Sequence, residues 1–484
     1  MPGSTTPLDY LLFHASYRGD DIALQGLAFR LSYAQLLPMV RAAAARLRAQ
    51  GIGPGTTVVT MIADKHIDFI VTLAAMHEGA ATMSCVDLSD YPPGIAPTLV
   101  VTDRAIGCAA PCLHIDGAWL SDTTLGGDPT PPRGFDADAP FRIAFTSGTT
   151  GHSKIIVQTL PRIVGAATDP AIGQQAMRNV AMMGFGSLLG FRDALATLLQ
   201  GSPLYHAATV ADVVALAAQQ EVQFISGSTF HLLALAQVLQ HTTLRLPALR
   251  QIRVSGTLPN AQQLALLQST LCPSVECRYG MSETGPTHRY QMQDRQVGEG
   301  CVGLPVPGVE TQIVDDAHRP LPPGREGRVR VRTQYMVNGY LGAPQRTAEA
   351  FIDGWFYPGD LGVIDARGML LLRGRVSEVI HRDGHRIDPA RIDAVALGHP
   401  QVIDAAAFGF VKHDGLDAIC LAVVGRPELD PPALLRHISD ALGMVLAPSH
   451  LIVVAAIPRN DMGKALRGEL QRLYADTVRG HAAH

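Results

Sequence analysis

Short apolar runs alternate with amphipathic helical stretches between Ser32 and Leu267 of the chain. The run Val58 to Ile62 has the composition of a strand, and the helical pattern that follows it opens at Asp64 and closes at Gly79. Repeated βα units of this kind are typical of parallel strands, because a crossover helix brings the chain back to the end of the sheet at which the previous strand began. The alternation therefore predicts an α/β fold with mostly parallel, helix-covered sheets, whose ligands gather beyond the carboxyl ends of the strands.

The pattern changes twice further along the chain. Alternating runs between Gly/Pro turns, such as Gly327 to Arg332, predict an antiparallel β subdomain over about residues 300–375. Mixed helical and strand patterns then return. We therefore expect a large N-terminal domain over residues 1–375 and a small α+β domain over residues 376–484.

Composition limits the partners of the chain. Of its 484 residues 47% are hydrophobic and the formal net charge is −4, so it has ample material for a core and no basic excess for nucleic acid or anionic membranes. Its seven cysteines are scattered without a CxxC pair or zinc spacing, which is typical of free thiols in a reducing compartment. We find no signal-peptide pattern and no long uncharged apolar run. We expect a cytoplasmic protein without nucleic-acid or membrane partners; its oligomeric state stays open.

The stretch from Phe145 to Lys154, FTSGTTGHSK, has the composition of a loop that binds polyphosphate. Small residues let backbone N–H groups approach, hydroxyls donate hydrogen bonds, and the terminal lysine adds a positive charge. Its spacing is not that of a Walker A loop, so we predict a phosphate loop of another kind, with an ordinary surface loop as the alternative. Its candidate binding residues are Thr146, Ser147, Gly148, Thr149, Thr150, Gly151 and Lys154.

Four further motifs follow: YGMSET at 279–284, GWFYPGD at 354–360, GRVSE at 374–378 and PRNDMGK at 458–464. With the phosphate loop, their order and spacing resemble the adenylate-forming (ANL) superfamily of acyl- and aryl-CoA synthetases, adenylation domains and beetle luciferases. The resemblance spans residues 30–470. It implies a mobile C-terminal domain and a two-step reaction, in which a carboxylic acid attacks the α-phosphate of ATP to release pyrophosphate and a thiol then displaces AMP.

The resemblance implies roles for the residues on the nucleotide side. The phosphate loop with Lys154 would hold the β- and γ-phosphates of ATP. Glu283 would bind Mg²⁺, a cation that prefers hard oxygen ligands. Tyr279, followed by Gly280, would pack against adenine, and Ser282 would reach a phosphate.

The remaining motifs imply ribose contacts and the main catalytic group. Asp360 resembles the aspartate that accepts both ribose hydroxyls, and Arg375 would add a donor to the same ribose. Lys464, with Arg467 also at a family position, would bridge the attacking carboxylate and the α-phosphate and so stabilise the first transition state. A loop beside the nucleotide and the acyl group would consist of Ser255, Gly256 and Thr257. The catalytic candidates are thus Lys464, Glu283 and Lys154.

The chain departs from the family pattern at three motif positions. Ser153 replaces a proline that is usual in the phosphate loop, and Pro358 replaces a threonine. At the hinge, where aspartate or lysine is common, the chain has Ser377, and a hinge only has to absorb φ/ψ rotation. We hypothesise that the C-terminal domain turns about Ser377 between the two steps and exchanges Lys464 for the segment around Gly384.

By the same resemblance, the acyl pocket would be neutral and partly apolar. Its candidate residues are Phe185, Ser187, Leu188, Ser228 and Met281. Leu188 stands where amino-acid-activating members carry an aspartate, and Ser187 where CoA synthetases often carry a histidine. We therefore expect an aryl or short acyl carboxylate as substrate rather than an α-amino acid. We interpret His288 and Arg289 as solvated loop side chains, with recognition of a polar substituent on the substrate as the alternative.

These patterns predict an ATP- and Mg²⁺-dependent acid–thiol ligase. The acceptor would be coenzyme A or the phosphopantetheine of an acyl or aryl carrier protein, since both present the same thiol arm. A catalytically silent adenylate-binding sensor or scaffold is the alternative from another class. A phosphotransferase that forms ADP is a third.

Overall fold

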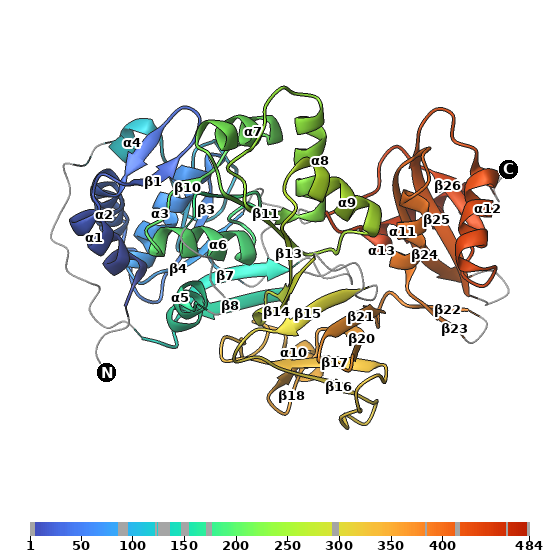
Figure 1. The fold of residues 1–484 in the computed structure, drawn as a ribbon. Helices are drawn as coiled ribbons and strands as arrows, with labels where there is room; N and C mark the ends of the chain where they lie inside the picture. Colours follow the sequence, from blue (N-terminus) through green and yellow to red (C-terminus); the bar gives the residue numbers. More distant parts are fainter. Residues whose placement is uncertain are drawn as a thin grey trace.

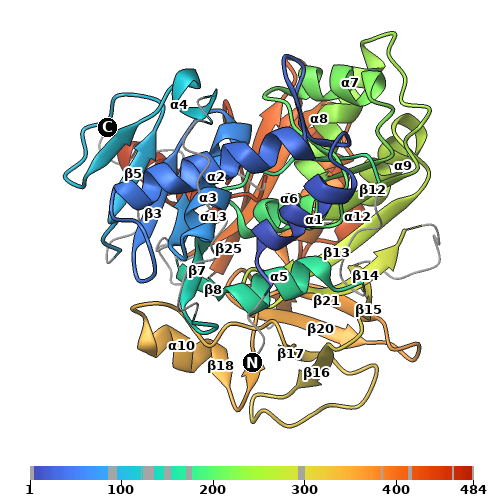
Figure 2. The ribbon, with the colours of Figure 1, turned by 90° about the vertical axis from the view of Figure 1, so that its left-hand side faces the viewer.

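The computed structural model describes residues 5–85, 95–121, 123, 136–146, 154–170, 177–292, 300–382, 385–411, 417–460 and 463–481. Figure 1 shows a large N-terminal part in blue and green, a β-rich part in yellow and light orange below it, and a C-terminal part in orange and red beside it. Figure 2 shows the β-rich part below the N-terminal part in a second view. The C-terminal part thus packs against one flank of the larger body.

One sheet of six strands lies in the N-terminal part, in the order β6-β5-β3-β4-β7-β8. The pairings are parallel except for the antiparallel hairpin β7–β8, which confirms the predicted parallel arrangement in this sheet. Its strands are β3 (Thr57–Met61), β4 (Ala81–Ser84), β5 (Leu99–Thr102), β6 (Cys112–His114), β7 (Pro140–Thr146) and β8 (Lys154–Thr159).

A second sheet of 15 strands runs from the N-terminal part into the β-rich part. The strands β1, β10, β9, β11, β12 and β13 are parallel neighbours in that order. From β13 the pairing continues antiparallel through β14, β15 and β21. The bounds are β1 (Ile22–Gln25), β2 (Arg30–Ser32), β9 (Asn179–Ala181), β10 (Leu204–Tyr205), β11 (Phe224–Ser228), β12 (Gln251–Ser255), β13 (Val275–Met281), β14 (Gly285–Gln291), β15 (Cys301–Pro305) and β21 (Leu370–Arg375).

The β-rich part is antiparallel throughout, as predicted from its alternating runs. Val302, Val329 and Phe356 are buried in its core. Its remaining elements are β16 (Glu310–Val314), β17 (Gly327–Arg332), α10 (Pro344–Ala350), β18 (Phe351–Ile352), β19 (Trp355–Phe356) and β20 (Asp360–Ile364).

Nine helices are described in the N-terminal part, and their apolar faces build its cores. The helix α2 begins at a capping box, where the Ser32 hydroxyl accepts a hydrogen bond from the backbone N–H of Gln35. The helices are α1 (Pro7–Tyr17), α2 (Tyr33–Ala49), α3 (Lys65–His77), α4 (Gly117–Ser121), α5 (Leu160–Thr168), α6 (Leu188–Leu199), α7 (Val210–Gln219), α8 (Thr229–Gln240) and α9 (Ala261–Thr270). None of the described helices is long and apolar enough to cross a membrane.

The C-terminal part is a small sheet covered on both faces. Along β25 (Asp417–Gly425), Leu421 packs in the core with α11 (Pro389–Leu397) and α12 (Pro431–Leu442), whereas Cys420 packs with α13 (Arg467–His481). This alternation follows from the period of two along a strand. The other strands are β22 (Ile380–Arg382), β23 (His385–Ile387), β24 (Val402–Val411) and β26 (His450–Val453).

A glycine just before Lys464 lets the C-terminal part approach α8 closely. A Cβ atom on Gly463 would lie 2.5 Å from Cβ of Phe230, and the φ angle of Gly463 is +73°. Both the space and the backbone conformation therefore favour glycine at this position. The contact holds the segment that carries Lys464 against the N-terminal part.

Candidate active site

The ends of the phosphate loop lie side by side. Thr146 ends β7 and Lys154 begins β8, and the two residues are paired across the hairpin. The remaining loop candidates lie outside the described residues. These are Ser147, Gly148, Thr149, Thr150 and Gly151.

Lys154 and Glu283 meet through a tyrosine that the sequence motifs do not include. The Tyr340 hydroxyl donates to Oε1 of Glu283 over 2.7 Å, and Nζ of Lys154 lies 3.3 Å from that hydroxyl oxygen. Burial and the Glu283 charge raise the pKa of Tyr340, so the phenol stays protonated as a donor. Tyr340 lies far from Glu283 in the chain, and no pattern in the sequence links them.

A second group joins Tyr279, Asp360 and Arg375. The Tyr279 hydroxyl donates to Oδ2 of Asp360 over 2.5 Å, and Nε of Arg375 lies 3.1 Å from Oδ1. Asp360 and Arg375 are paired residues of β20 and β21, whereas Tyr279 comes from β13. The structure therefore brings together the residues expected at adenine and at the ribose.

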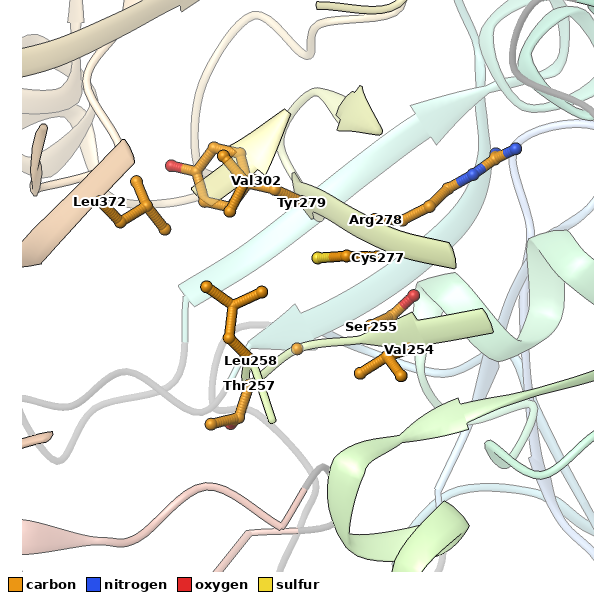
Figure 3. A pocket seen from close by; sticks show the side chains of 10 residues that line it. Val254, Ser255, Thr257, Leu258, Cys277, Arg278, Tyr279, Val302 and Leu372 are labelled. Atoms are coloured by element: carbon orange, nitrogen blue, oxygen red, sulfur yellow. The ribbon is translucent and has the colours of Figure 1, made fainter. Parts of the chain in front are cut away.

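A small pocket adjoins this group, beyond the carboxyl end of β12 and beside the middle of β13 (Figure 3). Its wall includes the predicted loop Ser255, Gly256 and Thr257, together with Tyr279 and Leu372. The position agrees with the rule that ligands in α/β sheets bind beyond the carboxyl ends of strands. Leu258, Val302 and Leu372 give the pocket apolar walls.

The YGMSET motif runs from the last residues of β13 into the turn before β14. Gly280 is tightly packed, because a Cβ atom there would lie 2.4 Å from the carbonyl oxygen of Gly285. The Ser282 carbonyl accepts a hydrogen bond from Nε2 of Gln158 in β8, over 3.3 Å. This contact ties the Glu283 turn to the strand that follows the phosphate loop.

Lys464 is held by an ion-pair network in the C-terminal part. Its Nζ lies 2.7 Å from Oε1 of Glu378, whose Oε2 lies 3.3 Å from Nε of Arg467. Arg467 also reaches Oδ2 of Asp393 over 2.6 Å. Sequence reasoning assigned no role to Glu378, although it ends the GRVSE motif.

The charge environment of Lys464 connects the two parts of the molecule. Burial and the positive charge of Arg375 lower the pKa of Lys464, while Glu378 and Asp360 act in the opposite direction. The ammonium group is therefore within electrostatic reach of the Asp360–Arg375 pair.

The predicted hinge residue lies between two strands. Ser377 is exposed in the turn between the end of β21 and the start of β22. Gly374 precedes it with a φ angle of +103° and packs against Asp388, the N-cap of α11. Gly384 lies outside the described residues.

The predicted acyl-pocket residues are divided by the structure. Phe185 and Leu188 are buried in the main core of the N-terminal part. Ser187 and Ser228 cap α6 and α8, each accepting a bond from a backbone N–H. Met281 is half-buried against the core of the β-rich part.

The interpretation of His288 as a solvated loop side chain was wrong. His288 lies in β14, is 1% exposed, and forms contacts of 3.1 and 3.2 Å with the hydroxyls of Thr287 and Thr311. Burial lowers the pKa of His288 to about 3. Its neighbour Arg289 is exposed, as alternation along the strand requires.

Sequence reasoning also missed a row of buried charged side chains on the sheet beneath α6. Nε of Arg253 and Nε of Arg278 lie 2.7 and 2.8 Å from the same Oε1 atom of Glu276. Arg192 and Asp193 of α6 lie over them. Single charged residues within strands form neither a periodic pattern nor a motif, so the sequence did not indicate this row.

Comparison with known proteins identifies the family. The family model described as "AMP-binding enzyme" matches residues 13–341, more than half of the chain. A fatty acid–[acyl-carrier-protein] ligase, ScoC of Streptomyces coeruleorubidus, is 29% identical over 75% of this chain and 72% of its own length. A probable CoA ligase, CCL9 of Humulus lupulus, is 28% identical over 91% of this chain and 90% of its own length.

The fold agrees with this match. The structure of ATP-bound MatB from Rhodopseudomonas palustris superposes with a TM-score of 0.84, covering 97% of this chain and 99% of that chain at 22% identity. The resemblance inferred from the five motifs is confirmed. The chain belongs to the AMP-binding enzyme family, within the superfamily of adenylate-forming ligases.

Proposed function

We propose that the chain activates a carboxylic acid with ATP, releasing pyrophosphate, and then transfers the acyl group from the adenylate to a thiol. The placement of Lys464 is the observation that carries the proposal, because its Nζ lies 2.7 Å from Oε1 of Glu378, three residues after the Arg375 that pairs with Asp360. A cation delivered beside the nucleotide can stabilise charge that develops between the acid and the α-phosphate.

The adenosine half of ATP has a matching surface. The pocket beside Tyr279 would take the base, and the Asp360 carboxylate can accept hydrogen bonds from two ribose hydroxyls. Arg375 holds that carboxylate in place. These contacts support the roles expected from the motifs.

Glu283 fits the proposed Mg²⁺. Tyr340 engages its Oε1, and among the described residues no hydrogen bond or ion pair engages its Oε2. One carboxylate oxygen suits Mg²⁺, which keeps several waters and takes its other ligands from phosphate groups. When bound, the ion would neutralise phosphate charge, while Lys154 would bind the departing pyrophosphate.

The acceptor, the domain division and the location are further parts of the proposal. One relative is named as a carrier-protein ligase and another as a CoA ligase, so either thiol fits.

We propose domains of residues 1–375 and 376–484 that rotate about Ser377. Free cysteines, five of them buried, support a cytoplasmic location.

Replacing the central lysine tests the proposal. We expect Lys464→Ala to abolish carboxylate-dependent ATP–pyrophosphate exchange while ATP binding, measured by calorimetry, stays nearly unchanged. Arg472→Ala is the matched control, since it removes an exposed cation from the same part of the chain. Near-normal exchange in Lys464→Ala would overturn the assignment.

Analysis of the reaction products distinguishes the proposed ligase from the two alternative functions. A panel of carboxylic acids, with and without CoA, should yield AMP and pyrophosphate from ATP. Formation of ADP would indicate a phosphotransferase. Tight binding of AMP without turnover of any acid would indicate a sensor or scaffold.

A further inference from the structure

The central strands of the large sheet have two faces of opposite character. On one face, Ile225, Ile252 and Val275 are buried against α7, α8 and α9. The other face carries polar residues in register. One row is Ser226, Arg253 and Glu276, and the next is Ser228, Ser255 and Arg278. A helix-covered sheet is normally apolar on both faces, so the polar face needs an explanation.

Helix α6 covers this polar face and adds two more charges. Asp193 accepts a hydrogen bond from the Ser226 hydroxyl over 3.3 Å. The neighbouring Arg192 side chain is only 11% exposed. We name Arg192, Asp193, Arg253, Glu276 and Arg278 the α6 charge cluster. Its three arginines and two carboxylates leave one positive charge unneutralised.

That charge belongs to Arg192. Arg253 and Arg278 both donate to Glu276. Burial alone would raise the pKa of Glu276, but these two arginines lower it, so the carboxylate is ionised. Arg192, in contrast, has its nearest carboxylate oxygen, on Asp193, at 3.9 Å, and no hydrogen bond engages its guanidinium among the described residues. A buried cation without close compensation is costly unless an anion completes the site.

The α6 charge cluster borders the candidate active site. Nη1 of Arg192 lies 3.1 Å from the position of a Cβ atom on Gly285, two residues after Glu283. Arg278 borders the pocket with Ser255 and Tyr279, and Figure 3 shows its guanidinium extending away from Tyr279. The unneutralised positive charge of Arg192 therefore lies next to the proposed nucleotide site, but not on the side where adenine would bind.

We propose that the acid activated by this chain carries a second anionic group, as a dicarboxylic acid does, and that Arg192 binds that group. The inference rests on the proposed acid activation. It replaces the neutral pocket expected from the sequence with one that carries a positive charge. Arg253, Glu276 and Arg278 would position Arg192 and the substrate rather than react.

Matched acids test the proposal through pyrophosphate exchange. Each monoacid is paired with the diacid of the same length or ring: hexanoate with adipate, butyrate with succinate, and benzoate with isophthalate. We expect at least one diacid to exceed its partner in kcat/KM by about 10-fold or more, since a hydrogen bond to a charged group supplies a discrimination of that order.

Substitutions of Arg192 test whether this side chain causes the preference for diacids. Arg192→Met should lower kcat/KM for the diacid about 10- to 100-fold through KM and leave the monoacid unchanged or improved. Arg192→Lys should retain part of the preference, because it keeps the charge. Arg245→Met, at an exposed arginine, is the control. Thermal stabilisation of the AMP-bound protein by the free diacid, present in the natural chain and lost in Arg192→Met, gives a readout independent of turnover.

Three results would overturn the proposal. Preference for every monoacid over its diacid, or equal losses for both acids in Arg192→Met, would assign the α6 charge cluster to structure alone and leave acid activation standing. Absence of exchange with every acid, together with no stabilisation by any diacid, would refute both this inference and the proposed function.

Discussion

The Tyr340 phenol joins two side chains that sequence motifs treat separately. It donates to Glu283 and lies within hydrogen-bonding distance of Lys154. Because its pKa is raised by burial and by Glu283, it cannot give up its proton to either neighbour near neutral pH. Tyr340 therefore fixes the orientation of the proposed Mg²⁺ ligand.

Tyr340→Phe tests this positioning role. Loss of a hydrogen bond to a charged group costs about 1.5–3 kcal/mol, so we expect pyrophosphate exchange to fall about 10-fold or more. The Mg²⁺ concentration for half-maximal exchange should rise as well. Tyr357→Phe, which removes a buried hydroxyl bonded to His318 and Arg330, is the control. An unchanged Mg²⁺ dependence would argue against the role.

The motif residues could be located from the sequence because they lie at the ends of strands, where the turns that follow give the motifs a regular spacing. Asp360 and Arg375, for example, begin and end adjacent strands. Tyr340 and Arg192 could not be located in this way. Their roles depend on partners brought near by the folded chain, and the sequence gives no sign of those distances.

At the level of elements, His288 connects β14 to β16. Its Nε2 lies 3.2 Å from the Thr311 hydroxyl, and its ring lies 5.7 Å from that of Tyr279. The folded protein keeps the ring neutral because burial lowers its pKa to about 3, whereas an unfolded histidine has a pKa of about 6.5. Its stabilising contribution is therefore complete above about pH 6.5 and is lost as the pH falls toward 3.

The melting temperature should show this dependence. We expect Tm to decline as the pH falls from 6.5 to 4, and to decline less steeply in His288→Gln than in the natural chain. His241→Gln, at an exposed position, should leave the slope unchanged. Parallel slopes for the natural chain and His288→Gln would show that this side chain does not contribute.

The elements that could be predicted are those with long, regular patterns. The helical pattern from Leu188 to Leu199 predicts α6 with its observed limits. The strand predicted at Val58 to Ile62 is β3, which lies one residue earlier, and the strand predicted at Ile252 to Val254 is β12, which is one residue longer at each end. The β1–β2 pair was not predicted, because such short strands show too little alternation. The apolar run Ala181 to Met183 predicts a strand, but the strand β9 lies at Asn179–Ala181, where it pairs with β11.

For the whole molecule, the proposed switch between half-reactions depends on the exposed turn at Ser377. Proline fixes φ near −65° and would restrict the rotation. We expect Ser377→Pro to slow thioester formation more than pyrophosphate exchange, measured separately on one preparation. Ser377→Gly should affect neither step much, because it keeps the turn free. Equal slowing of both steps by proline would place the hinge elsewhere.

Among the residues that the structure describes, every ion pair that holds Lys464 lies on the C-terminal side of Ser377. Glu378, Asp393 and Arg467 would therefore travel with the lysine during the rotation as one rigid group. The motion would break only the contacts across the divide, such as that between Gly463 and Phe230. That contact is apolar, but Lys464 also faces the charges of Arg375 and Asp360 across the divide, so added salt should change the rate of the domain rotation as well as the rate at which charged reactants arrive.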